Sequence, residues 1–176
     1  MMVALAACGT AQTATNAPES SSADSAAQPV DAAPPAAASN PLCDLATQAE
    51  VQAVIGGSIT KIDVIDVADL TSLDCVYLDP QDFKKGLSIQ YTTTERLVKT
   101  NSQWSTTADY FAEWTRGETP VAGLGEGAAW VDITNSLWVL KGDTVVEIST
   151  DSVDTSDAAS HTAVETLAGQ VVARLP

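Results

Sequence analysis

Residues 128–149 read AAWVDITNSLWVLKGDTVVEIS, and this stretch decides the fold class. It contains three β-favouring runs, Ala128–Ile133, Ser136–Leu140 and Thr144–Ser149, separated by only two and three residues. The pair Gly142-Asp143 between the last two runs is typical of a tight hairpin. Because such short connections join antiparallel neighbours, the stretch predicts one side of an antiparallel sheet.

The residues before this stretch predict three further strands. Their β-favouring runs are Ile59–Val67, Leu73–Leu78 and Leu87–Thr92, and a polar turn around Pro80–Gly86 separates the second from the third. The segment Val121–Gly127 is predicted to be a turn that leads into the second set of strands rather than a phosphate-binding loop, because it lacks the residues of a nucleotide-loop motif.

Three helices complete the expected fold. Thr47 and Glu50 have the spacing of a capping box, so a first helix should follow and end at Gly56-Gly57. A second helix is expected over Thr106–Thr115, and a third over Ala158–Leu175 with Asp157 as its cap. The order helix, three strands, helix, three strands, helix predicts an α+β domain over residues 41–176, with helices packed on an antiparallel sheet.

Composition limits the classes of function. The chain has 176 residues, 23 acidic and 8 basic side chains, and a formal net charge of −15. This length suits one modest domain, and the mean hydropathy of +0.06 excludes a polytopic membrane protein. A pI near 4.1 argues against nucleic-acid binding, because the surface repels phosphate.

The N-terminus predicts a lipid anchor. Leu5-Ala6-Ala7-Cys8 resembles the lipobox of bacterial lipoproteins, which implies cleavage before Cys8 and a diacylglycerol on its thiol. Residues 1–7 would then be the remnant of a signal peptide whose true start lies upstream, since no basic residue precedes the apolar run. The rest of the segment 8–40 is rich in Ala, Ser, Thr and Pro, and we expect a disordered stalk that spans about 30 Å.

Two cysteines remain in the expected domain. Cys43 and Cys75 form an even pair in a chain expected to be exported, which predicts a disulfide. The alternative is a metal site that includes His161, but these three residues lack a characteristic ligand spacing. We expect His161, the only histidine, to be a solvated helix residue, because no nucleophile motif accompanies it.

The sequence offers no catalytic, cofactor-binding or metal-binding motif. Aspartates gather at 63–82 and at 151–157, where weak calcium binding is the alternative to a solvated acidic face. Neither segment has the spacing of a calcium-binding loop, so the solvated face is favoured.

The four tryptophans are the best candidates for a contact surface. Trp114 and Trp130 have core-like positions in their predicted elements. Trp104 and Trp138 are therefore the predicted exposed contacts, since aromatic side chains supply large contact areas.

Several short motifs resemble small uncharacterised lipoproteins of actinobacteria. They are Cys43–Val51, Leu73–Tyr77 and Val121–Trp130, and the likeness covers Pro41–Pro176. The resemblance implies an exported, envelope-anchored domain with one disulfide and transfers no catalytic residue.

Two functions remain in view. The first is a non-catalytic interaction module at the extracytoplasmic face of the cell membrane, such as an accessory or assembly subunit of an integral membrane protein complex. The alternative is a carrier or sensor that binds a lipid or glycan between sheet and helices, which a buried cavity of several hundred Å³ would favour. An enzyme is the least favoured class, because no catalytic residues can be assigned.

Overall fold

The computed structural model of the chain describes residues 40–59, 61–82, 85–150 and 158–176. The predicted signal remnant, the lipidated Cys8 and the stalk up to residue 39 lie outside this range. So do the second aspartate-rich segment and the predicted cap Asp157. These predictions therefore stay predictions.

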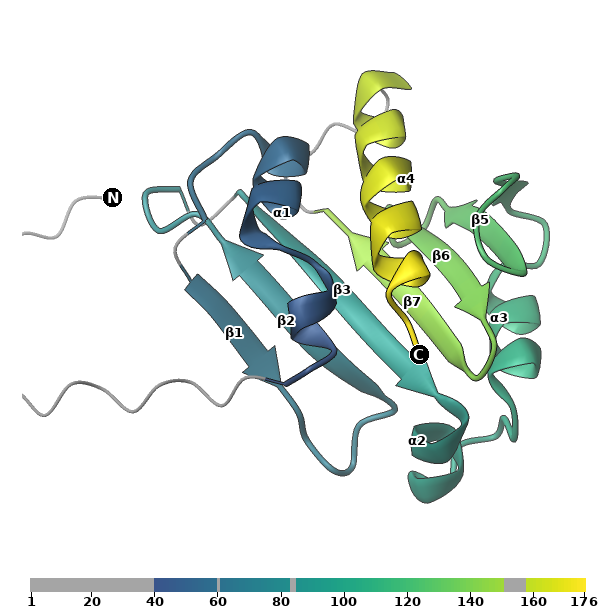
Figure 1. Cartoon of the computed structure of the whole chain (residues 1–176). Coiled ribbons are helices and arrows are strands. Elements are labelled where there is room, and N and C mark those ends of the chain that lie inside the picture. The colour runs from purple at the N-terminus through teal and green to yellow at the C-terminus, as the bar shows by residue number, and fades with distance from the viewer. Residues whose placement is uncertain (1–39, 60, 83–84, 151–157) are drawn as a thin grey trace, which may run out of the picture. The chain divides into compact units, whose positions relative to one another are not determined.

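An antiparallel sheet of seven strands forms the centre of the described domain. The strands are β1 (Lys61–Ile65), β2 (Ser72–Leu78), β3 (Gly86–Thr93), β4 (Thr119–Pro120), β5 (Gly127–Val131), β6 (Ser136–Lys141) and β7 (Thr144–Ser149). Their spatial order is β1-β2-β3-β7-β6-β5-β4, so two meanders meet where β3 pairs with β7 (Figure 1). This pairing places Gln90 opposite Glu147 and Ile89 opposite Ile148.

Helices lie on both faces of the sheet. The helical elements are a 3-10 turn η1 (Cys43–Leu45), α1 (Gln48–Ile55), α2 (Thr94–Lys99), α3 (Thr107–Trp114) and α4 (Ala158–Ala173). Figure 1 shows α1 and α4 side by side on one face, which we call the inner face. Tyr110 and Phe111 of α3 pack on Trp138 and Val145, whose side chains point to the other face, which we call the outer face.

Local sequence explains the bounds of α1. The Thr47 hydroxyl accepts a hydrogen bond from the Glu50 backbone N–H, and the Glu50 carboxylate accepts one from the Thr47 N–H, which completes the predicted capping box. Gly56 ends the helix with a φ of +66°, a left-handed conformation that a side chain would strain.

The main core lies between the inner face and α1 and α4. Every second residue of β2 and β3 is buried there, including Tyr77, Ile89 and Tyr91. From α4, Val164 and Leu167 contribute to the same core. This alternation follows from the period of a β-strand and accounts for the strand assignments made from sequence.

The predicted α+β class is confirmed, but the predicted element order is incomplete. The predicted order lacks α2, which starts directly after β3. Thr93 is the last residue of β3 and also caps α2, because its hydroxyl accepts a hydrogen bond from the Arg96 N–H. The β-branched run 92–94 favours continued strand and conceals this start. It also lacks β4, a two-residue edge strand that includes Pro120.

The predicted turn at 121–127 leads into β5 as expected. Gly125 has a φ of +55°, and a Cβ there would collide with the backbone oxygen of Leu140. The Glu126 N–H donates to that same carbonyl oxygen at 2.8 Å, and its carboxylate accepts from the Gly142 N–H at 3.0 Å. Glu126 therefore fastens the turn to the β6–β7 hairpin.

Candidate functional site

The predicted disulfide is present. Cys43 of η1 and Cys75 of β2 are bonded, with their Cα atoms 5.5 Å apart. Both residues are buried in the main core, and the Tyr77 hydroxyl donates to the Cys43 carbonyl oxygen at 2.9 Å. The bond ties the entry of the domain to the sheet. It also removes both thiols from the alternative metal site, and the described residues hold no cluster of three or more His, Cys, Asp or Glu placed to bind a metal ion.

Aromatic side chains gather where α3 packs on the outer face. The aromatic cluster consists of Trp104, Tyr110, Trp114 and Trp138. Tyr110 lies at the centre: its ring centroid is 4.9 Å from that of Trp104, 6.3 Å from that of Trp114 and 5.5 Å from that of Trp138. Trp114 and Trp138 are stacked, with centroids 5.7 Å apart and an interplanar angle of 24°. Contacts of this geometry stabilise a fixed arrangement of rings.

The structure reverses two of the predicted tryptophan environments. Trp138 was expected to be exposed, and this prediction is wrong, because α3 covers it and only 2% of it is accessible. Trp114 was expected in the core, yet it is 41% exposed, because it lies at the last residue of α3 and only one side of it stacks on Trp138. Trp104 is half-buried against Tyr110, and Trp130 is buried as predicted.

One sequence signal indicates the burial of Trp138. Leu137, Trp138 and Val139 are consecutive apolar residues in β6, and such a run is typical of a strand covered on both faces. Leu137 and Val139 belong to the main core, while Trp138 belongs to the separate cluster under α3. The exposed surface of the aromatic cluster is therefore made by Trp114 and, in part, by Trp104 and Tyr110, with Trp138 as its buried support.

Polar groups border the aromatic cluster on the outer face. The Trp138 indole N–H donates to the Ser136 hydroxyl at 2.8 Å. Glu147 lies opposite Trp138 on the neighbouring strand, and its desolvation is the largest cause that raises the pKa of its carboxyl. Desolvation, followed by the charge of Glu147, raises the pKa of Tyr110 to about 12. Glu147 is thus a carboxylate held partly out of water, beside aromatic rings.

His161 is not the solvated residue that the sequence predicted. It is half-buried, and its ring stacks on Trp130 with centroids 4.1 Å apart and an angle of 16°. The Trp130 indole N–H donates to the Glu165 carboxylate at 3.1 Å, so both residues of α4 hold one side chain of β5. These contacts hold α4 against the sheet, and this packing role accounts for the position of His161.

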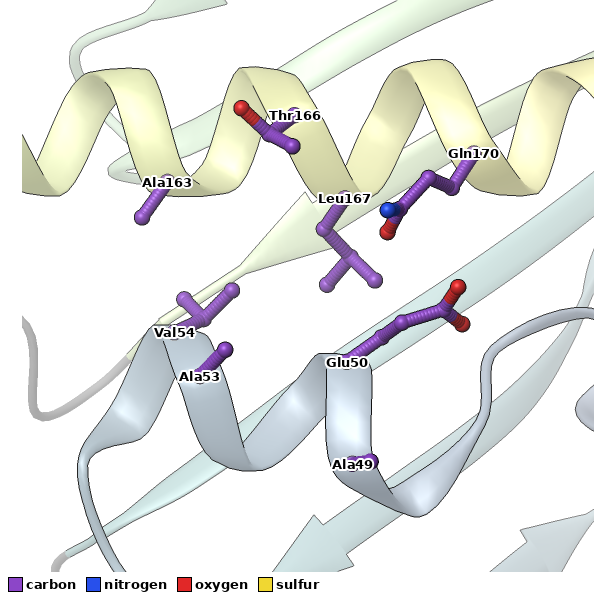
Figure 2. Close-up of a pocket in the computed structure, with 8 residues that line it drawn as sticks. All are labelled: Ala49, Glu50, Ala53, Val54, Ala163, Thr166, Leu167 and Gln170. Carbon is purple, nitrogen blue, oxygen red and sulfur yellow. The ribbon is translucent and has the colours of Figure 1, made fainter.

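A groove lies between α1 and α4, on the side of these two helices that faces solvent. Its volume is about 330 Å³, and Figure 2 shows Val54 of α1 and Leu167 of α4 pointing into it. Glu50 and Gln170 lie at one end. The Glu50 carboxylate is engaged by the Arg174 guanidinium at 2.5 Å and 2.8 Å, so the charge at this end is neutralised.

Exposed aliphatic side chains also gather at the β1 edge of the sheet. On and after β1, a second group of exposed aliphatic side chains comprises Ile62, Ile65, Val67 and Leu70. Within the described ranges, no helix combines the length and apolar character needed to cross a membrane.

Comparison with known proteins adds no relative: no family model, no curated protein and no solved structure matches this chain.

Proposed function

We propose that this protein is a non-catalytic interaction module, held by a lipid on Cys8 at the extracytoplasmic face of the membrane. Its domain would bind an integral membrane protein as an accessory or assembly subunit. The stalk would give the domain a reach of about 30 Å from its anchor.

The exposure of Trp114 carries this proposal. A large aromatic side chain that is 41% exposed leaves apolar area in contact with water, and covering that area by a partner is favourable. Trp114 is also held in place by Trp138 and Tyr110, so little conformational entropy is lost when a partner covers it. Tryptophan is enriched among the residues that contribute most to protein interfaces.

The packing of the core also favours an interaction module over a ligand carrier. A carrier of the expected kind would hold its ligand between sheet and helices. In this domain Val51 of α1, Leu167 of α4 and Ile89 of β3 meet in that layer, each with almost no accessible surface. The burial of these three side chains favours a packed layer over a ligand cavity at this position.

Photo-crosslinking tests the proposal. The full-length protein, produced in its own host, would carry benzoylphenylalanine in place of Trp114, and a control would carry it in place of Val98, which is 62% exposed on α2. We expect position 114 to form a crosslink with one membrane protein and position 98 to form none with it. Equal crosslinking from both positions, or none from position 114, would overturn the proposal.

The α1–α4 groove favours a second candidate, binding of a small apolar ligand such as an acyl chain. Its lining is mostly apolar, from Ala49, Ala53, Val54, Ala163 and Leu167. Native mass spectrometry of the protein extracted from membranes tests this candidate. A bound lipid that is lost when Ala163→Phe fills the groove, and kept when Ala112→Phe adds the same ring to α3, would establish it. Absence of a bound species would rule it out.

A further inference from the structure

The two edges of the sheet differ in their capacity to pair with another strand. In the described domain β4 forms one edge and β1 the other (Figure 1). β4 has only two residues and includes Pro120, whose nitrogen has no hydrogen to donate. β1 has five residues, Lys61–Ile65, and contains neither proline nor glycine. Short length and proline both protect a sheet edge from further pairing, and β1 has neither of these protections.

The backbone of β1 has hydrogen-bonding groups on its free side. β1 pairs with β2 in an antiparallel register that runs from Lys61 opposite Leu78 to Ile65 opposite Asp74. In such a pair, alternate residues direct their N–H and C=O groups toward the partner strand, and the residues between them direct theirs away from it. No other strand of the described domain pairs with β1 on that side. The free side of β1 therefore presents donors and acceptors in the geometry of a sheet.

Exposed aliphatic side chains border this edge on both faces of the sheet. Ile62 lies opposite the buried Tyr77, and residues opposite one another share a face, so Ile62 is on the inner face. Ile65 is three residues further along the strand and therefore lies on the outer face. Ile62 is 37% exposed and Ile65 is 41% exposed. A strand added at this edge would cover both side chains, whereas a ligand on one face would cover only one of them.

The segment after β1 extends this apolar surface, and Arg96 holds the segment in place. The Arg96 guanidinium forms an ion pair with Asp66 and donates to the carbonyl oxygens of Leu70 and Ser72, at 3.4 Å and 3.0 Å. Val67 and Leu70 are exposed. Of the seven large apolar side chains that are exposed in the described domain, four thus lie on β1 or within the five residues that follow it.

We propose that two copies of this chain associate through β1, with their edge strands paired antiparallel so that the two sheets form one continuous sheet. β1 suits this role, because three of its five residues, Ile62, Val64 and Ile65, are β-branched. A twofold axis brings the same strand of each copy together, so each copy covers the exposed aliphatic side chains of the other. The protected edge at β4 offers no site for a third copy, so the assembly closes as a dimer.

Net charge opposes this association and gives it a characteristic salt dependence. Each copy carries a formal charge of −15, so two copies repel one another at low ionic strength. Next to the contact, the ion pair with Arg96 neutralises Asp66. Salt screens the repulsion between the copies, whereas strand pairing and apolar contact do not depend on unlike charges. The dimer should therefore become tighter as the NaCl concentration rises.

Sedimentation velocity of the full-length, oxidised chain tests the inference. Cys8→Ser removes the predicted lipidation site, so the chain can be measured without detergent. At about 100 μM protein and about 0.15 M NaCl, we expect a species of twice the chain mass of 18.2 kDa. The dissociation constant should fall at higher NaCl concentration. A monomer under these conditions, or a dimer that salt dissociates, would overturn the inference.

Two matched variants locate the contact. Ile65→Lys places a charge on the edge strand, and Ile133→Lys makes the same substitution in the turn between β5 and β6, where Ile133 is 86% exposed. Both variants change the net charge equally, so they differ only in position. We expect Ile65→Lys to weaken the dimer by about tenfold and Ile133→Lys to alter it by less than about twofold. Equal effects of the two variants would contradict pairing through β1.

Hydrogen exchange of the chain without a substitution in its domain gives a second measurement. The amides of β1 should exchange more slowly at about 100 μM than at about 1 μM, whereas the amides of β5 should exchange equally at both concentrations. Equal protection of β1 at both concentrations would mean that the chain's own residues cover the edge. Equally fast exchange at both would mean that the edge stays free. Either result would overturn the inference.

The outcomes separate this inference from the proposed function, because Trp114 belongs to α3, which packs against β6 and β7 rather than β1. If position 114 crosslinks to a membrane protein but the chain stays a monomer, the interaction module stands and the dimer fails. If the dimer forms through β1 but position 114 forms no crosslink, the dimer stands and the proposed partner contact fails.

Discussion

Removing the disulfide should cost the domain a large part of its stability. Cys43 and Cys75 lie 32 residues apart, and opening a loop of this length returns about 3.5–4 kcal/mol of chain entropy to the unfolded state. Small domains are stable by only about 5–15 kcal/mol. We therefore expect the Cys43→Ala, Cys75→Ala double variant to remain folded at 25 °C but to unfold at much lower denaturant concentration.

Urea titration measures this loss. With an m-value of about 2 kcal/mol/M, the midpoint should fall by about 2 M relative to the oxidised wild type. Reduction of the wild type should produce a similar fall, whereas reductant should leave the double variant unchanged. A fall of less than about 0.5 M, or two free thiols in the native exported protein, would contradict a stabilising role for this disulfide.

Three further predictions concern single contacts. Tyr91→Phe should leave the free energy of unfolding unchanged or raise it by about 1 kcal/mol, because the buried Tyr91 hydroxyl has no hydrogen-bond partner among the described residues. Tyr77→Phe should lower it by about 1 kcal/mol in the same urea titration, because the hydrogen bond to the Cys43 carbonyl oxygen is lost. The Arg174 guanidinium lowers the pKa of Glu50 to about 2. The Glu50 carboxylate therefore stabilises the fold above pH 4.5 and loses that contribution as the pH falls toward 2. Thermal unfolding measured against pH should show a smaller fall in melting temperature at acid pH for Arg174→Ala than for the wild type. Gly125→Ala should lower the melting temperature by several degrees, because its φ is positive and its Cβ would meet backbone, and an unchanged value would contradict the turn geometry.

Local sequence signals were enough to predict most of the fold. The alternation in β2, the short hairpin at Gly142 and the capping box at Thr47 each depend on neighbours within a few residues, so they can be recognised without tertiary information. The start of α2 could not be recognised in the sequence, because Thr93 is both the last residue of β3 and the cap of the helix.

The candidate site was predictable only in part. Trp104 and Trp138 do belong to one cluster, and the apolar run Leu137–Val139 indicates that Trp138 is buried. The sequence does not show that α3 is the helix that covers it, nor that Trp114 lies exposed at the end of that helix. The contact of His161 with Trp130 joins residues 31 positions apart on different elements, so no local pattern reports it.

The most direct test of the interaction module is to isolate the native protein from mildly solubilised membranes and identify by mass spectrometry all proteins and lipids that accompany it. We expect an integral membrane protein in stoichiometric amount, lost from Trp114→Ala but retained by Val98→Ala. The chain recovered alone, or with a defined lipid as its sole companion, would contradict a role as an interaction module.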